Sequence, residues 1–132
     1  EVMLEAFSKY GVERAVSLFN GMFAFAVWDD AERVLWLVRD RLGVKPLYYT
    51  FKKGCFYFAS ELKPLMSQLK ELEIDRVSLS QMIRHGYISA PRTIFKDVYK
   101  LLPGAMLRYD LSGSWPEEHF SGVPFEAKAL SL

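Results

Sequence analysis

Residues 21–61, GMFAFAVWDDAERVLWLVRDRLGVKPLYYTFKKGCFYFASE, contain the pattern that decides the fold of this 132-residue chain. Four short apolar runs lie within this stretch, at Met22–Trp28, Val34–Val38, Leu47–Phe51 and Cys55–Ala59. Each run is rich in aromatic and β-branched residues and is bounded by charged or glycine-containing turns, which is typical of β-strands. The stretch therefore predicts four strands.

The connections between these runs are of two kinds. Residues 29–33 (DDAER) and residues 52–54 (KKG) are short, polar and compatible with hairpin turns. Residues 39–46 (RDRLGVKP) differ, because they place four charges, a glycine and a proline between two apolar runs. We therefore expect two β-hairpins joined by a charged loop.

The first two predicted strands are apolar on both faces. Within Met22–Trp28, Ala24 and Trp28 alternate with Phe23 and Phe25, and the next run alternates valine and tryptophan with leucine. A sheet with one solvated face would instead alternate apolar with polar residues. We therefore predict a layered domain, with helices covering one face of this sheet and another layer covering the other.

Amphipathic periodicity predicts four short helices outside the strand block. They are expected at residues 2–10, 13–19, 61–69 and 79–85. Ser60 is the predicted N-cap of the third helix, and Ser78 with Gln81 matches a capping box for the fourth, which ends at Gly86. A last strand is predicted at Ala105–Asp110.

Composition indicates one compact domain and excludes several function classes. The chain is 51% hydrophobic and carries 17 Lys and Arg against 16 Asp and Glu, so its charge gives no reason to expect nucleic acid or an anionic membrane as partner. It has no apolar run of about 18 residues that would span a membrane. A single cysteine excludes an internal disulfide and fits a reducing compartment, and no targeting pattern opens the chain. We therefore expect a cytoplasmic location.

Four segments together resemble a known family. They are residues 20–29 (NGMFAFAVWD), 38–49 (VRDRLGVKPLYY), 56–65 (FYFASELKPL) and 86–104 (GYISAPRTIFKDVYKLLPG). In this order they resemble the second half of the class II glutamine amidotransferase domain of asparagine synthetases, over residues 1 to about 104. The RDRLGVKPLYY block followed by SELK is specific for class II amidotransferases. GYISAPRTIF and KLLPG narrow the resemblance to asparagine-synthetase-type members.

The resemblance implies a fold and a domain organisation. The expected class is α+β, as part of a four-layer αββα N-terminal-nucleophile sandwich with antiparallel sheets. Residues 1–110 would be the C-terminal half of the amidotransferase domain, and residues 111–132 a tail leading to a synthetase domain. Because the chain begins at Glu1 within a helical pattern, we expect it to be a fragment of a longer protein.

The catalytic nucleophile that the resemblance implies is a cysteine at the mature N-terminus, whose free α-amino group has an ordinary pKa of about 7.7–8.0 and can act as the base. Cys55 is the only cysteine here and lies inside the chain, so we interpret it as a buried structural residue. His85 and His119 lack partners at metal-ligand spacing, so no metal-binding residue is predicted. No catalytic or substrate-binding residue is predicted either. The fragment alone is therefore expected to be inactive.

The residues that match the family block form a predicted supporting shell near the glutamine pocket. They are Arg39, Asp40, Gly43, Lys45, Pro46, Ser60 and Glu61. Adjacent buried charges should pair locally, a glycine permits backbone conformations that side chains forbid, and a proline stiffens the return to the next strand. Two interpretations stay open: the loop supports the glutamine pocket and borders the ammonia exit, or it is an ion-paired connector without catalytic role.

The resemblance leaves three functions open. The first is the glutaminase part of an asparagine synthetase, with glutamine and the rest of its own chain as partners, possibly as a homodimer. ATP and Mg2+ would then bind in the absent synthetase domain, and no cofactor would bind in this chain. The second is the same domain serving another acceptor, a sugar carboxylate or a β-lactam-type substrate. The third is a non-catalytic module that keeps the fold for binding.

Overall fold

The computed structural model describes residues 2–110 and 128–129. The elements are α1 (Val2–Tyr10), α2 (Val12–Leu18), β1 (Ala24–Asp29), β2 (Val34–Arg39), β3 (Tyr48–Lys52), β4 (Cys55–Ala59), α3 (Leu62–Gln68), α4 (Arg76–His85), β5 (Tyr99–Lys100), β6 (Ala105–Asp110) and β7 (Lys128–Ala129). All four strands predicted in residues 21–61 are present, and β6 has the predicted bounds. None of the helices described here has the length and apolarity that crossing a membrane requires.

The strands form two small antiparallel sheets, which confirms the α+β class. Sheet one has the order β1-β2-β6-β7, and sheet two has the order β4-β3-β5. The two predicted hairpins are β1–β2 and β3–β4. β6 returns from far along the chain to pair with β2, so that Leu37 lies opposite Leu107.

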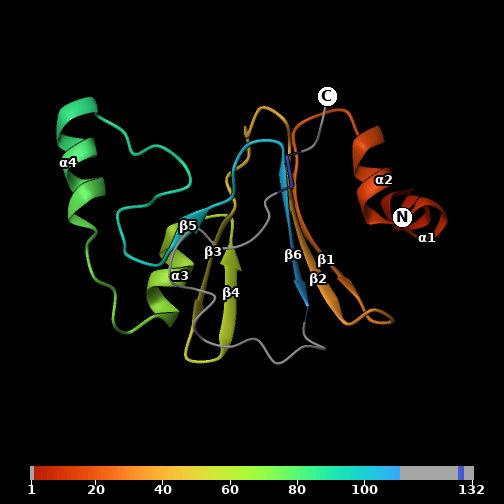
Figure 1. The fold of residues 1–132 in the computed structure, drawn as a ribbon, viewed down its shortest axis with the longest axis horizontal. Helices are drawn as coiled ribbons and strands as arrows, with labels where there is room; N and C mark the ends of the chain where they lie inside the picture. The colour runs from red at the N-terminus through yellow and green to blue at the C-terminus, as the bar shows by residue number, and fades with distance from the viewer. Residues whose placement is uncertain (1, 111–127, 130–132) are drawn as a thin grey trace.

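Helices α1 and α2 cover one face of sheet one (Figure 1). Val16 of α2 packs with Val38 of β2 and Met106 of β6, and the rings of Phe7 and Phe25 extend the same cluster. Their centroids lie 5.9 Å apart, within the range of favourable aromatic contacts. The predicted helical cover of this sheet is therefore confirmed.

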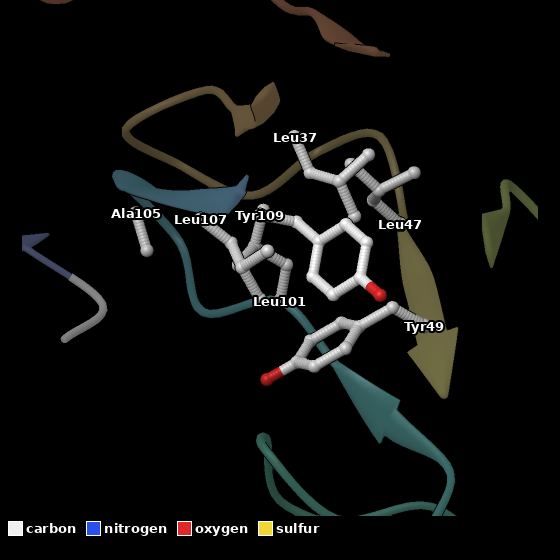
Figure 2. Close-up of a cluster of buried hydrophobic side chains, with 7 residues drawn as sticks. All are labelled: Leu37, Leu47, Tyr49, Leu101, Ala105, Leu107 and Tyr109. Carbon is white, nitrogen blue, oxygen red and sulfur yellow. The ribbon is translucent and has the colours of Figure 1, made fainter. Parts of the chain in front are cut away.

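Sheet two covers the other face. Figure 2 shows this inter-sheet core, in which Leu37, Leu107 and Tyr109 of sheet one meet Tyr49 of sheet two. The ring of Tyr109 also stacks on that of Phe56 with centroids 4.6 Å apart. Burial of the Tyr49 phenol in this core, with a smaller contribution from Tyr99, raises the pKa of Tyr49 to about 12. The inter-sheet core is thus dry where β2 and β6 face β3.

The outer face of sheet two is covered by α3, where Leu65 and Leu69 pack with Val98. Both faces of β2 are thus covered as predicted, but the prediction is wrong for β1. Ala26 is exposed and Trp28 keeps 40% of its surface exposed. The reason is that β1 is the edge strand of sheet one, and only its Ala24 packs against the inter-sheet core.

Two predicted helix starts are wrong. The cap of α4 is Asp75, three residues before the predicted cap Ser78, because the Asp75 carboxylate accepts hydrogen bonds from the backbone N–H groups of Val77 and Ser78, both at 3.3 Å. Ser78 is therefore inside the helix. α3 is capped by Glu61 rather than Ser60, and the Glu61 side chain makes no capping hydrogen bond. The predicted helix end at Gly86 is confirmed by its left-handed conformation, with φ of 78°.

The predicted division at residue 110 stays a prediction. Of the predicted tail, residues 111–127 and 130–132 lie outside the described residues. Lys128–Ala129 pairs with β6 as strand β7, with Ala129 opposite Ala105.

Candidate functional site

The charged loop of residues 39–46 begins with Arg39, the last residue of β2, and is organised by the Arg39 side chain; we call it the Arg39 loop. Only 5% of Arg39 is exposed. Its Nε donates to the carbonyl of Lys45 at 2.7 Å, and its Nη2 donates to the carbonyl of Gly43. Its Nη1 donates to the carbonyl of Leu101, which is 62 residues further along the chain. One guanidinium therefore shapes the loop and fastens it to the segment that precedes β6.

Asp40 holds the same loop from the inside. It is 1% exposed, and its Oδ1 accepts hydrogen bonds from the N–H groups of Leu42 at 3.0 Å and Val44 at 3.2 Å. Its Oδ2 accepts a longer bond from Lys45 N–H at 3.4 Å. The Asp40 carbonyl also accepts from the N–H of Gly104 at 2.8 Å. The carboxylate and the backbone of one residue thus fix both the loop and the following segment.

The prediction that Arg39 and Asp40 form an ion pair is wrong: among the described residues neither side chain makes one. Arg39 makes its hydrogen bonds to backbone carbonyls, and Asp40 makes its own with backbone N–H groups. Each buried charge is solvated by peptide dipoles instead of by its neighbour.

The pKa shifts follow from this solvation. Burial lowers the pKa of Arg39, although the nearby Asp40 charge opposes the shift. For Asp40, burial would raise the pKa, but hydrogen bonds from the N–H groups of Val44, Lys45, Leu42 and Gly43 together outweigh it and lower the pKa. A carboxylate that accepts several backbone hydrogen bonds stays ionised at neutral pH.

Replacing Asp40 by asparagine is expected to flatten the acid limb of the stability curve. The folded pKa lies below the unfolded value of about 3.9, so the carboxylate stabilises the fold above that pH. This contribution is lost as pH falls through the folded pKa. Asp40→Asn should therefore be less stable than wild type at pH 7, with the difference shrinking below about pH 4. Urea unfolding between pH 2 and 7 measures it, and a constant difference would contradict the assignment.

Gly43 has the conformation that the sequence predicted. Its φ is 65°, in the left-handed region that side chains disfavour. A Cβ at this position would lie 2.7 Å from Cγ of Pro103 and 3.1 Å from Cζ of Arg39. Glycine is therefore required twice here, by backbone conformation and by the close approach of Pro103.

The structure joins five of the seven predicted shell residues in one loop and leaves two outside its hydrogen bonds. Arg39, Asp40 and Gly43 interlock, Lys45 joins through its backbone N–H and carbonyl, and Pro46 follows in the same loop. Ser60 and Glu61 are exposed. They lie just beyond Ala59, which pairs with Tyr48, so the register places them at the sheet end where the Arg39 loop enters β3. Within the described residues no hydrogen bond connects them to the loop.

Three residues of this site were not predicted as members: Leu101, Pro103 and Gly104. Each meets the Arg39 loop through its backbone or ring. The signal was present in the sequence as KLLPG, but only the pairing of β6 with β2 brings that segment beside the loop. The site is thus a rigid junction of two chain segments, able to position neighbouring groups and lacking a nucleophile of its own.

The cysteine and the histidines considered in the sequence form no catalytic group among the described residues. Cys55 was predicted to be buried within a strand; it is exposed, as the first residue of β4 opposite Lys52 beside the hairpin turn. His85 is the last residue of α4, as predicted, and His119 lies outside the described residues. In the described ranges no group of three or more His, Cys, Asp or Glu side chains is placed to hold a metal ion.

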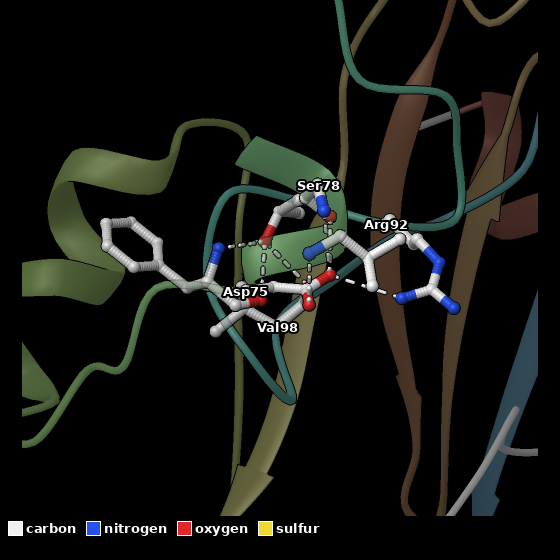
Figure 3. Close-up of polar contacts among 7 residues, drawn as sticks. Asp75, Ser78, Arg92 and Val98 are labelled. Carbon is white, nitrogen blue, oxygen red and sulfur yellow. Dashed lines mark hydrogen bonds and ion pairs between the residues drawn. The ribbon is translucent and has the colours of Figure 1, made fainter. Parts of the chain in front are cut away.

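A second polar cluster fastens α4 to the segment before β5 (Figure 3). Asp75 Oδ2 accepts from Ser78 Oγ at 2.6 Å and from Arg92 Nη1 at 3.1 Å. Thr93 Oγ1, in turn, donates to the Val98 carbonyl at 2.8 Å. The hydrogen bond from Ser78, with smaller contributions from backbone N–H groups and Arg92, lowers the pKa of Asp75 despite its partial burial. The cluster is a structural anchor.

Comparison with known proteins gives a family match. The family model described as glutamine amidotransferase domain matches residues 1–120. Over 105 residues the chain is 41% identical to glutamine-hydrolyzing asparagine synthetase 1 of Bacillus subtilis, covering 80% of this chain and 16% of that protein. A putative glutamine-hydrolyzing asparagine synthetase 2 of Methanocaldococcus jannaschii is 36% identical over 115 residues, covering 84% and 22%. Amidase chyE of Penicillium rubens is 34% identical over 107 residues, covering 81% and 15%. The chain spans less than a quarter of each of these relatives.

Proposed function

The chain belongs to the glutamine amidotransferase domain family and is related to asparagine synthetases, and from this premise we propose that it is part of the glutaminase domain of a glutamine-hydrolysing asparagine synthetase. In this proposal the whole protein converts glutamine to glutamate and ammonia, and passes the ammonia to ATP-activated aspartate. The observation that carries the proposal is the family match over residues 1–120, together with relatives named as glutamine-hydrolysing synthetases.

The packing of the described residues supports the finer fold. Two antiparallel sheets stack face to face, α1 and α2 lie outside sheet one, and α3 lies outside sheet two. This order of layers is the one expected for an αββα N-terminal-nucleophile sandwich. We propose that the exposed edge and face of β1 lie in the part of that sandwich completed by residues outside this chain.

The proposed division of labour leaves the chemistry outside residues 1–132. The nucleophilic cysteine and the glutamine-contacting residues belong to the first half of the domain, and ATP and Mg2+ belong to a synthetase domain. The chain contributes the Arg39 loop as a support beside the glutamine pocket, because hydrogen bonds to two buried charges hold its backbone in place. A cytoplasmic, homodimeric protein is the expected setting.

A second acceptor class has one observation in its favour. The relative from Penicillium rubens is named an amidase, so a similar domain also occurs in a protein that is not named as an asparagine synthetase. The acceptor is a property of the region outside this chain. A sugar carboxylate or β-lactam-type acceptor therefore stays the alternative to aspartate.

The test uses the full-length protein with amide-labelled glutamine. We expect glutamate release, and label transfer to asparagine when aspartate and ATP are supplied. The 132-residue chain alone is the negative control and should release no ammonia. Full-length protein that hydrolyses glutamine but labels another carboxylate would select the alternative acceptor, and absence of glutamine hydrolysis would leave a non-catalytic binding module.

A further inference from the structure

A groove of about 380 Å³ lies between α4 and the outer side of sheet two. Its walls are formed by Leu62 at the start of α3, by Met82 and Ile88 at the end of α4 and beyond it, by Ile94, and by Tyr48 and Lys100 of sheet two. Figure 1 shows α4 standing away from the sheets, with the following segment returning to β5. The groove is thus open to solvent along a helix that the main cores do not cover.

Large apolar side chains are exposed around this groove. Met82 is 47% exposed and Tyr87 63% exposed, although both line it. Ile83, 79% exposed on the same helix, does not line the groove. Single exposed apolar residues are ordinary, but a contiguous group that lines a groove is typical of a contact surface.

Two cations line the groove, and they differ in their partners. Arg92 is bonded to Asp75 at 3.1 Å. Lys100 has no carboxylate within 4.0 Å among the described residues, and its ammonium lies 5.5 Å from the centre of the Tyr48 ring. Burial, with a smaller contribution from the nearby Arg39 charge, lowers the pKa of Lys100. A partly desolvated, unpaired cation in apolar walls favours an anionic group from outside.

Lys100 also connects the groove to the Arg39 loop. Its backbone N–H donates to the Pro91 carbonyl at 2.8 Å, which holds the groove wall to β5. The next residue is Leu101, whose carbonyl accepts from Arg39. A segment seated in the groove would therefore rest against the strand that positions the proposed support of the glutamine pocket.

We propose that this groove docks a peptide segment that carries apolar side chains and a carboxylate, with the carboxylate on Lys100, and that the segment belongs to the same polypeptide outside residues 1–132. The inference rests on the proposed function, in which this chain is one part of a longer synthetase. A tethered segment has a high effective concentration, so a shallow groove with one ion pair suffices to hold it.

The test compares matched variants in the full-length protein by hydrogen exchange. Lys100→Glu and Met82→Asp remove the charge partner and the apolar wall, and should speed exchange of the hydrogen-bonded amides of Gly86 and Arg92 by about tenfold. Lys100→Arg keeps the charge, and Ile83→Asp places the same carboxylate on the adjacent residue outside the groove wall. Both controls should exchange as wild type, and the β2 and β6 amides should be unchanged in all four.

The remaining outcomes decide against the proposal. Unchanged exchange in Lys100→Glu and Met82→Asp overturns the docking site. An effect that disappears on dilution, together with loss of a dimer in light scattering, would assign the groove to a second copy and overturn the intramolecular segment. Glutamine hydrolysis is measured on the same samples; its absence in wild type overturns the proposed function, while the exchange result still decides the docking.

Discussion

Replacing Arg39 by alanine is expected to reduce the local free energy of unfolding by about 3–5 kcal/mol. The substitution leaves the carbonyls of Gly43, Lys45 and Leu101 without their donors in a region where Arg39 is only 5% exposed. Unpaired buried polar groups retain their full desolvation cost. Hydrogen exchange of the β2 and β6 amides in the full-length protein measures the loss.

Arg41 provides the matched control for this substitution. It lies in the same loop, is exposed, and donates one hydrogen bond of 3.2 Å to the Ser17 carbonyl. Arg41→Ala should therefore change stability by no more than about 0.5 kcal/mol. Equal losses for the two variants would contradict the central place given to Arg39.

The Arg39→Ala variant also distinguishes the two interpretations of the Arg39 loop. If the loop supports the glutamine pocket, Arg39→Ala should lower glutamine hydrolysis per folded molecule, because a displaced support misplaces the groups that it holds. If hydrolysis per folded molecule is unchanged while stability falls, the loop is a connector. Measuring the folded fraction and the glutaminase rate on one sample decides between them.

Replacing Gly43 by alanine is expected to cost about 2–4 kcal/mol, from two separable causes. A φ of 65° is unfavourable for any residue with a side chain, and the added Cβ would lie 2.7 Å from the ring of Pro103. The ring cannot rotate away, so the backbone must shift. Thermal unfolding of the variant measures the sum.

Gly86 separates the two causes. Its φ of 78° is similar, but a Cβ there would meet nothing within 4 Å. Gly86→Ala should therefore cost only the conformational part, about 1–2 kcal/mol. Adding Pro103→Ala to Gly43→Ala removes the nearest ring atom and should recover part of the loss. A Gly43→Ala variant no less stable than Gly86→Ala would refute the tight packing against Pro103.

The four strands of residues 21–61 and the layers that cover them were largely predictable, because periodicity within this stretch is local information. Alternation in β1 and β2 identified two apolar faces, and the structure covers both faces of β2. The exposure of Trp28 was not predictable, because position at the sheet edge depends on β6 pairing with β2 and not with β1. Pattern specifies which residues form a strand, and long-range pairing specifies its neighbours.

Helix starts failed where two local signals competed. Asp75 and Ser78 are both good N-cap residues, and the spacing to Gln81 favoured Ser78. Asp75 is the cap, and it also binds Arg92, which is 17 residues away in sequence. That tertiary contact adds to the local preference and is invisible to a window of neighbouring residues.

The candidate site was predicted as a set of residues but not as a geometry. The block from Arg39 to Pro46 was identified by its resemblance, and the conformation of Gly43 followed from its residue type. The partners of Arg39 and Asp40 were predicted wrongly because peptide groups, which every residue carries, leave no mark in a sequence. Leu101 contributes only a carbonyl, so its residue type gave no signal of this role.

The hydrogen bonds from Arg39 to Leu101 and from Gly104 to Asp40 join two points of the chain that are about 62 positions apart. The segment between them contains β3 to β5, and these bonds hold its two ends together beside sheet one. Doubling the length of a flexible loop adds only about 0.6 kcal/mol of closure entropy. Sheet one should therefore tolerate insertions or deletions near α4. Its strand pairing is held by the hydrogen bonds at the two ends of this segment and does not depend on the length of the segment.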